Sequence, residues 1–137
     1  MKKYLFTLVF LLFVLFGNSQ NYLISSGGTV NTCVGDFYDS GGSGGNYGAS
    51  ENFTMTFHST SGINTHIRMD IHNFDVDPSD TLYIYDGSNT GAPLIGKYNN
   101  ANPLGGLAVQ ASIYNLVGDL TFQFISNGVT QATGWFA

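Results

Sequence analysis

Apolar and polar residues alternate in several short segments of this chain, with the two-residue period of a β-strand. Phe53, Met55 and Phe57 alternate with threonines, and this pattern predicts a half-buried strand. The same alternation recurs in three further segments: 67–71, 82–85 and 120–124. No segment has the apolar period of an amphipathic helix. The pattern therefore predicts an all-β fold, an antiparallel β-sandwich.

Shorter apolar segments are interpreted as further strands, at residues 94–98, 108–114 and 134–137. Trp135 and Phe136 stand at the end of the sequence, where order is usually low, so we expect the last strand to be truncated. The segment from 35 to 50 is rich in glycine and serine, which is also typical of a flexible linker. Three aromatic residues interrupt it, and this favours an ordered loop.

The N-terminal segment has the pattern of a secretory signal peptide. Lys2 and Lys3 precede an apolar run over residues 4–16, and small residues follow at 17–19. The run is short for a membrane span, although a signal anchor is the alternative. We expect a signal peptide at residues 1–19, a leader or edge strand at 20–32, and a mature chain without a membrane span. The protein is therefore expected to be secreted or on the cell surface.

The charge balance excludes one class of partner. The chain has nine acidic and four basic residues and a net charge of −5. After signal removal Arg68 and Lys97 are the remaining fixed cations, so no basic patch is available for a phosphate backbone. Nucleic acid is not an expected partner, whereas metal cations and basic partners are compatible with the acidic charge.

Other candidate chemistry is limited. His66, Arg68, Asp70 and His72 share one face of a predicted strand. A zinc site or a catalytic pair would fit these residue types, but the polar outer face of a strand explains them equally. No local motif of a nucleophilic enzyme is present, so we expect a protein without catalytic activity. Asn52-Phe53-Thr54 is an N-glycosylation sequon, and whether Asn52 is glycosylated depends on the host cell.

Three spaced motifs resemble the CUB domain family, in the form found in exported bacterial proteins. The first is Phe74-Asp75-Val76-Asp77, followed by Asp80-Thr81-Leu82-Tyr83-Ile84-Tyr85-Asp86-Gly87. The second runs from Leu120 to Asn127 and continues at Gly134-Trp135. The third is Asn46-Tyr47. The resemblance covers residues 33–137 and implies a jelly-roll-like sandwich.

Many members of that family bind one calcium ion between loops at one end of the sandwich. The resemblance implies that Asp77, Asp80 and Asn127 are ligands and that Tyr47 supports the site. Asp77 stands where glutamate is usual, and Asn127 stands where aspartate is frequent. Both changes are expected to weaken calcium binding. Without the resemblance, residues 77–80 read as a solvated turn, because aspartate, proline and serine favour turns.

The single cysteine of the chain, Cys33, is unusual in an exported protein. It has no internal disulfide partner, so a free thiol or a bond to another chain is open. The resemblance implies that Cys33 is half of a family disulfide whose second position holds His58. We expect a free thiol, with His58→Cys as the substitution that restores the bond.

Two functions are open at this stage. The first is a non-enzymatic, calcium-dependent module that recognises an extracellular protein or carbohydrate. The alternative is a structural or targeting appendage of a larger exported enzyme or adhesin, with further domains in a longer chain.

Overall fold

The computed structural model describes residues 19–137, so the expected signal peptide at 1–19 lies outside the described residues except for Ser19. The larger sheet has five strands in the order β2 (Gly28–Thr32), β4 (Asn52–Ser59), β10 (Leu120–Ile125), β7 (Thr81–Tyr85) and β8 (Leu94–Tyr98). The smaller sheet has the order β1 (Asn21–Leu23), β3 (Asp36–Tyr38), β11 (Gly134–Phe136) and β6 (Asn73–Asp75). Two short 3₁₀ helices, η1 (Ile24–Ser26) and η2 (Gly42–Gly44), complete these elements.

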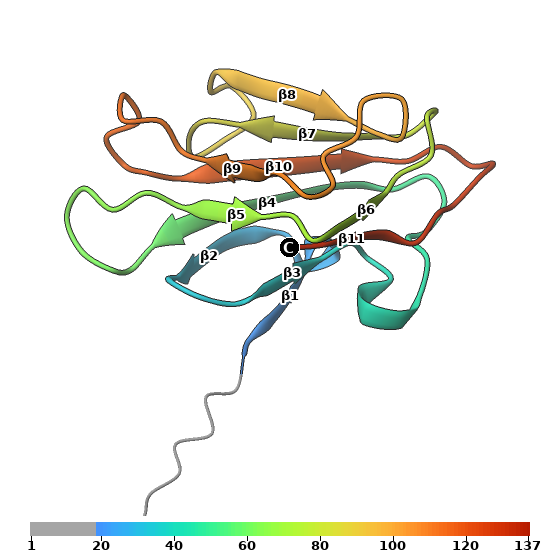
Figure 1. Cartoon of the computed structure of the whole chain (residues 1–137), viewed down its shortest axis with the longest axis horizontal. Helices are drawn as coiled ribbons and strands as arrows, with labels where there is room; N and C mark the ends of the chain where they lie inside the picture. The colour runs from blue at the N-terminus through green and yellow to red at the C-terminus, as the bar shows by residue number, and fades with distance from the viewer. Residues whose placement is uncertain (1–18) are drawn as a thin grey trace, which may run out of the picture.

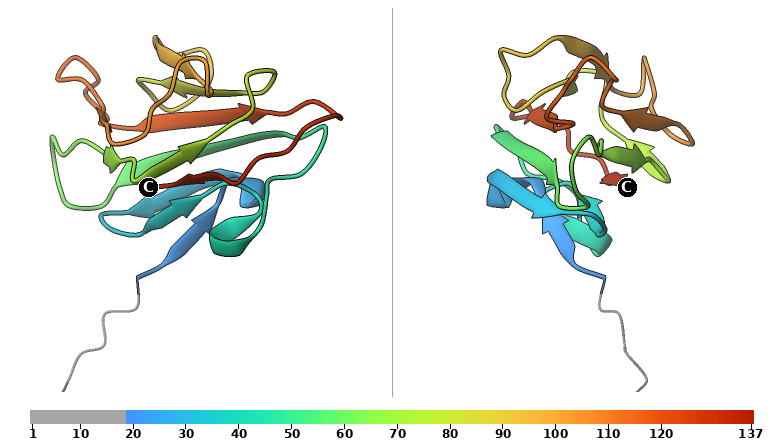
Figure 2. Two further views of the ribbon diagram at one scale, coloured as in Figure 1. Left: turned by 45° about the vertical axis from the view of Figure 1, so that its right-hand side comes forward. Right: turned by 90° about the vertical axis from the view of Figure 1, so that its left-hand side faces the viewer.

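A two-stranded sheet continues the layer of the smaller sheet. β5 (Arg68–Asp70) pairs with β9 (Ala108–Gln110) and precedes β6 by two residues. The His72 amide donates to the Phe136 carbonyl at 2.9 Å, which links this segment to β11. Figures 1 and 2 show the result as two layers, with β5, β6 and β11 lying across the larger sheet. The prediction of an all-β sandwich is confirmed.

The strands are not all antiparallel, which corrects one part of the prediction. β1 pairs with β3 in parallel, and β2 pairs with β4 in parallel. A parallel pair needs a crossover connection rather than a hairpin. Here η1 carries the chain from the edge of one sheet to the edge of the other, and the glycine-rich segment returns it to β4.

Aromatic rings form the centre of the core between the two sheets. Phe37 of β3 contacts Phe57 of β4, with ring centroids 4.9 Å apart, and Phe122 of β10 at 5.1 Å. Trp135 of β11 contacts Phe124 of β10 at 5.1 Å. Because rings of both sheets interdigitate, β11 is fastened to the larger sheet through its side chains.

The strands predicted at 53–57, 82–85, 94–98 and 120–124 are present. Alternate residues of β4, β7 and β10 point into the core, whereas Leu94 and Ile95 of β8 are exposed. The predicted strand over 108–114 is shorter and ends at Gln110. Its continuation turns away because the Ser112 amide donates to Asp86 Oδ1 at 3.0 Å. The 35–50 segment is ordered, as expected, and it contains both β3 and η2.

Within residues 19–137, no helix is long and apolar enough to cross a lipid bilayer.

Replacing leucine by alanine should affect the free energy of unfolding differently in the core and on the surface. Leu82 is fully buried in β7, whereas Leu116 is 82% exposed on the loop before β10. We expect Leu82→Ala to lower the free energy of unfolding by about 2–5 kcal/mol, and Leu116→Ala to change it by less than about 0.5 kcal/mol. Urea unfolding of both variants measures the difference. Equal losses would contradict the core described here.

Candidate acidic loop site

Three loops meet at one end of the sandwich because of the way β10 pairs. β4 and β7 both run antiparallel to β10, so Asn52 and Thr81 lie opposite Ile125 at its end. The segment before β4, the segment before β7 and the segment after β10 therefore converge. We call these segments, residues 46–51, 76–80 and 126–132, the acidic loop end. Tyr47, Asp77, Asp80 and Asn127 all lie on it, as the resemblance implied.

Asp80 is the centre of this end. Its side chain is buried, with the residue 1% exposed, directly before β7. The Tyr47 hydroxyl donates to Asp80 Oδ2 at 2.6 Å, and the backbone amide of Asn127 donates to Oδ1 at 2.7 Å. One carboxylate thus joins all three loops through charge-assisted hydrogen bonds.

Tyr47 has two partners at its hydroxyl. It donates to Asp80 and accepts from the backbone amide of Asp77 at 3.0 Å. Its ring packs edge-on against Phe124, with centroids 4.8 Å apart. Burial raises the pKa of the Tyr47 phenol above its ordinary value, and the hydrogen bond to Asp80 raises this pKa further. The phenol therefore stays a donor to Asp80.

Asp77 is half-buried and caps its own turn. The Ser79 hydroxyl and the Ser79 backbone amide both donate to Asp77 Oδ1, and these bonds hold the pKa of Asp77 below its ordinary value. The Asp80 amide donates to the Asp77 carbonyl at 2.9 Å. This is the arrangement of an Asx-type turn. Oδ2 of Asp77 accepts no hydrogen bond from residues 19–137.

The Asn127 side chain is oriented along its own loop. Its amide nitrogen donates to the Ser79 hydroxyl, and its amide oxygen accepts from the Val129 backbone amide at 2.8 Å. The oxygen that was expected to bind an ion is thus occupied within the 127–129 turn. Exchanging the two amide atoms would place an NH₂ group against the Val129 N–H, so this orientation is fixed by the network.

Asp75, two residues before Asp77 in the first motif, does not join Asp77 and Asp80. Asp75 Oδ1 accepts from the Asn100 side chain at 2.8 Å, and Oδ2 accepts from the Thr133 hydroxyl at 2.9 Å. These bonds hold the pKa of Asp75 below its ordinary value. Across residues 19–137, no group of three or more His, Cys, Asp or Glu side chains is arranged to hold a metal ion.

Two asparagines that the sequence analysis did not single out also support the site. Asn99 donates to the carbonyls of Pro78 and Asp80, at 3.0 and 3.1 Å, and so holds the turn from the side of β8. Asn100 accepts from the Val76 amide at 3.1 Å. An Asn-Asn pair after a strand is an ordinary turn signal, so nothing in the sequence linked it to the acidic loops.

The polar face of β5 is a solvated surface. Arg68 forms a salt bridge with its neighbour Asp70 at 2.8 Å, and both side chains are exposed. His72 packs against the Phe136 ring, with centroids 5.1 Å apart. This arrangement matches the polar outer face of a strand, and in the described residues it forms no metal cluster.

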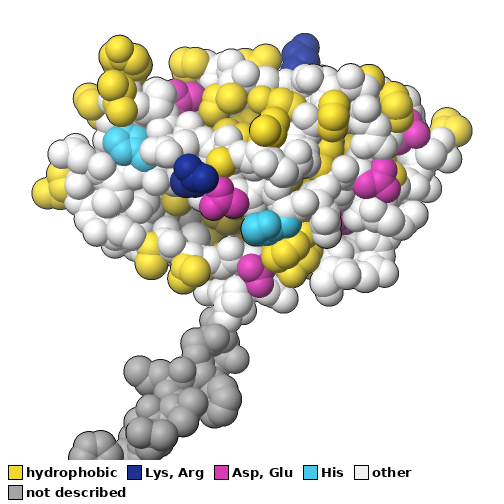
Figure 3. All heavy atoms as spheres, in the orientation of Figure 1, with side chains coloured by type: hydrophobic (Ala, Val, Ile, Leu, Met, Phe, Trp, Pro, Cys, Tyr) yellow, Lys and Arg dark blue, Asp and Glu magenta, His cyan; other side chains and the backbone are white. Residues whose placement is uncertain are grey.

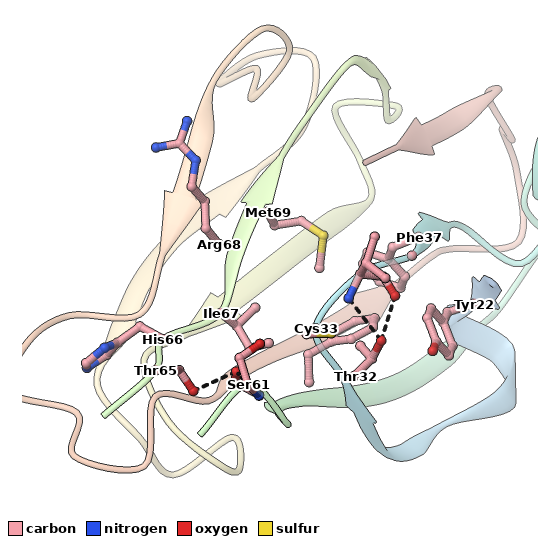
Figure 4. A pocket seen from close by; sticks show the side chains of 14 residues that line it. Tyr22, Thr32, Cys33, Phe37, Ser61, Thr65, His66, Ile67, Arg68 and Met69 are labelled. Carbon is pink, nitrogen blue, oxygen red and sulfur yellow. Dashed lines mark hydrogen bonds between the residues drawn. The ribbon is translucent and has the colours of Figure 1, made fainter. Parts of the chain in front are cut away.

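Cys33 is exposed and unpaired in the described residues, and the position proposed for its partner is wrong. In the parallel β2–β4 pair, Asn31 lies opposite His58 and Thr32 lies opposite Ser59. His58 contacts Asp119, with Nδ1 and Oδ1 2.6 Å apart. Cys33 and Ser59 instead both line a pocket of about 440 Å³ (Figure 4). The residue that faces His58 is therefore Asn31, two residues before Cys33.

No protein-family model matches the chain, and no curated protein matches its sequence. Solved structures do match. One is titled as the full extracellular region of zebrafish Gpr126/Adgrg6, with a TM-score of 0.62 and 14% sequence identity. The match covers 80% of this chain and 14% of that one. At this identity the match shows a shared all-β fold.

Removing one hydroxyl tests the centre of the acidic loop end. In Tyr47→Phe, Asp80 loses one of its two protein donors while staying buried, which should cost about 1–3 kcal/mol of unfolding free energy. Tyr114→Phe is the matched control, since Tyr114 is 88% exposed. In the wild type, the raised pKa of Tyr47 should also make stability fall as pH rises above about 10.

That alkaline loss should be smaller in Tyr47→Phe, which has no phenol to ionise at this position. Urea unfolding at neutral and alkaline pH measures both effects. If Tyr47→Phe and Tyr114→Phe are equally stable, the hydrogen bond to Asp80 does not hold the loops together.

An engineered thiol tests this register. Neighbouring strands lie about 4.8 Å apart, and a strand rises about 3.3 Å per residue. Cys33 lies two residues beyond Asn31, the partner of His58, which places its Cα beyond the roughly 7 Å limit for a disulfide to position 58. We expect His58→Cys to keep two free thiols on mild oxidation, measured by thiol counting and monomer mass. An internal disulfide in His58→Cys would contradict this register.

Proposed function

We propose that this chain is an exported, non-catalytic binding module whose acidic loop end is ordered by calcium. The single observation that carries the proposal is the buried Asp80 carboxylate at the meeting point of three loops. The resemblance to the CUB family supports it, because Asp77, Asp80, Asn127 and Tyr47 come together where that resemblance places a calcium site. The fold shared with an extracellular region agrees with export.

The donor atoms fit a calcium ion better than a transition metal. Asp77 Oδ2 is without a protein donor among the described residues, and each oxygen of Asp80 accepts one protein hydrogen bond. Carboxylates accept more than one such contact per oxygen. The side-chain atoms of Asp77 and Asp80 that could bind a metal are oxygens, the ligands that calcium prefers. Water and backbone carbonyls would supply the remaining positions.

Charge also favours a cation here. The salt bridges of residues 19–137 are His58–Asp119 and Arg68–Asp70, and Lys97 lies over the Tyr83 ring at 5.4 Å. None of these cations pairs with Asp77 or Asp80. Two carboxylates that share a loop end without a counter-charge repel each other, and a bound divalent ion would remove that repulsion.

The geometry around Asp119 supports the absence of catalysis. Ser88, His58 and Asp119 are adjacent, but the Ser88 hydroxyl donates to Asp119 Oδ2 at 2.7 Å rather than to the histidine. A catalytic serine needs the imidazole as its base. The alternative function, an appendage of a larger exported enzyme or adhesin with no ligand of its own, differs in one respect: it requires no response to calcium.

Thermal unfolding with calcium and with chelator tests this function. Calcium should raise the midpoint temperature of unfolding. At a calcium concentration of a hundred times the dissociation constant, the gain in the free energy of unfolding should be about 2.7 kcal/mol. Asp77→Asn should remove most of this gain, since Asp77 is accessible and its loss spares the buried network. Asn127→Asp should increase the gain by adding a negative ligand.

Asp70→Asn serves as the control, because it removes an exposed aspartate on β5 outside the acidic loop end. An identical midpoint in calcium and in chelator would reject the calcium part of the proposal. A gain that is unchanged in Asp77→Asn would place the ion elsewhere.

A further inference from the structure

A row of side chains crosses the outer face of the smaller sheet. Phe136 of β11 lies opposite Tyr38 of β3 on one side and opposite Asn73 of β6 on the other. Residues directly opposite in a sheet point to the same face. Their neighbour Trp135 points to the core, so Tyr38, Phe136 and Asn73 point outward. Figure 3 shows hydrophobic and histidine side chains together on this face, near the C-terminus.

The glycine-rich segment stands beside this row and encloses a pocket of about 400 Å³. Its lining includes the glycine-rich residues 42–45 together with Asn46 and Thr133. The Tyr38 and Phe136 rings, stacked with centroids 5.0 Å apart, form its apolar part. A pocket of this size with a few placed polar groups is typical of small-ligand sites.

Several polar groups of the lining have no partner among residues 19–137. The side chains of Asn73 and Ser43 and the Tyr38 hydroxyl make no hydrogen bond there, and Asn46 uses only its nitrogen, toward the Gln131 carbonyl. The lining contains no Asp, Glu, Lys or Arg. Free amides, hydroxyls and backbone groups around aromatic rings suit a neutral ligand with many hydroxyls and apolar C–H faces.

The pocket wall is held in place before any ligand binds. Asp39 is fully buried and accepts from the Gly41 amide at 2.6 Å and from the Trp135 amide at 3.1 Å. Its carboxylate therefore anchors the glycine-rich segment to β11. Gly134 makes room for it, because a Cβ at Gly134 would lie 2.1 Å from Asp39 Oδ2. A preformed wall lowers the entropy cost of binding.

Two other surface features give weaker support for a ligand site. The pocket beside Cys33 is larger, but the hydroxyls of Thr32 and Thr65 in its lining are already paired within their own loops (Figure 4). Exposed apolar residues gather on loops at the end away from Asp80, including Ile63 and Tyr114. Nothing in the structure indicates what covers them.

We propose that the pocket between Tyr38, Phe136, Asn73 and the glycine-rich segment binds a neutral carbohydrate. This assignment rests on the proposed function as a binding module, and it names the ligand class and a site that shares only Asn46 with the acidic loop end. A sugar ring would pack its C–H face on the aromatic row, and its hydroxyls would bond with Asn73, Asn46 and the glycine backbone.

Gly44 offers a sharp test, because a Cβ there meets no atom within 4 Å and its φ lies outside the left-handed region. Gly44→Leu should place a bulky side chain at the pocket wall without straining the fold. Asn73→Ala removes an exposed polar contact. Thr90→Leu, on the exposed loop between β7 and β8, adds the same side chain away from the pocket.

Calorimetric titration with neutral β-1,4-linked hexasaccharides of glucose, mannose and xylose measures binding, in calcium and in chelator. We expect at least one to bind the wild type and Thr90→Leu equally, and Gly44→Leu about tenfold more weakly or not at all. Asn73→Ala should weaken the same ligand. Binding should persist in chelator, because the pocket lies on the sheet face.

Two results would overturn the proposal: no binding of any of these sugars, or binding that survives Gly44→Leu unchanged. Loss of binding in chelator with Gly44→Leu unaffected would also overturn it, by placing the sugar at the acidic loops. Binding that depends on Gly44 in a protein with no thermal response to calcium would support this inference while the calcium proposal fails.

Discussion

The buried carboxylate of Asp80 is the interaction on which one whole end of this sandwich depends. A buried charge is costly unless hydrogen bonds compensate it, and here the compensating donors come from Tyr47 and Asn127 on two other loops. The loops must therefore approach in one geometry for the carboxylate to be tolerated. The rings beneath, Phe124 and Tyr47, fix the depth at which this happens. Packing and polar bonding thus specify the same loop arrangement, which is the condition for a single folded state.

Much of the fold was readable from the sequence because the central strands alternate cleanly. Alternate residues of β4, β7 and β10 point into the core, among them Phe57, Leu82 and Phe122. β1, β2 and β3 carry no comparable alternation, and their neighbours are glycine, serine and asparagine. β1 and β2 lie at sheet edges, and β3 lies between β1 and β11. Each is a strand because neighbouring strands pair with its backbone. The local sequence does not specify these partners, so the parallel pairing could not be foreseen.

The candidate site shows the same division. Tyr47, Asp77, Asp80 and Asn127 are brought to one end as the motif resemblance implied, but the direction of each side chain depends on contacts beyond the motif. Asn127 turns its oxygen to Val129, and Asp75 turns to Asn100 and Thr133. His58 was assigned to Cys33, but it lies opposite Asn31, two residues earlier in the chain. Register and orientation are tertiary properties, and spacing alone does not determine them.

The position of β11 in the smaller sheet has a consequence for the order of folding. β3 and β6 do not pair with each other, because β11 lies between them and pairs with both. A chain that emerges from its amino terminus during synthesis therefore cannot close this sheet until Phe136 is available. Until then β3 pairs only with β1, the β6 segment has no strand partner, and Trp135 does not yet cover the larger sheet. Folding during synthesis would therefore pass through an intermediate with exposed apolar surface, which is prone to aggregation. The pairing of β11 with β3 and β6 buries that surface.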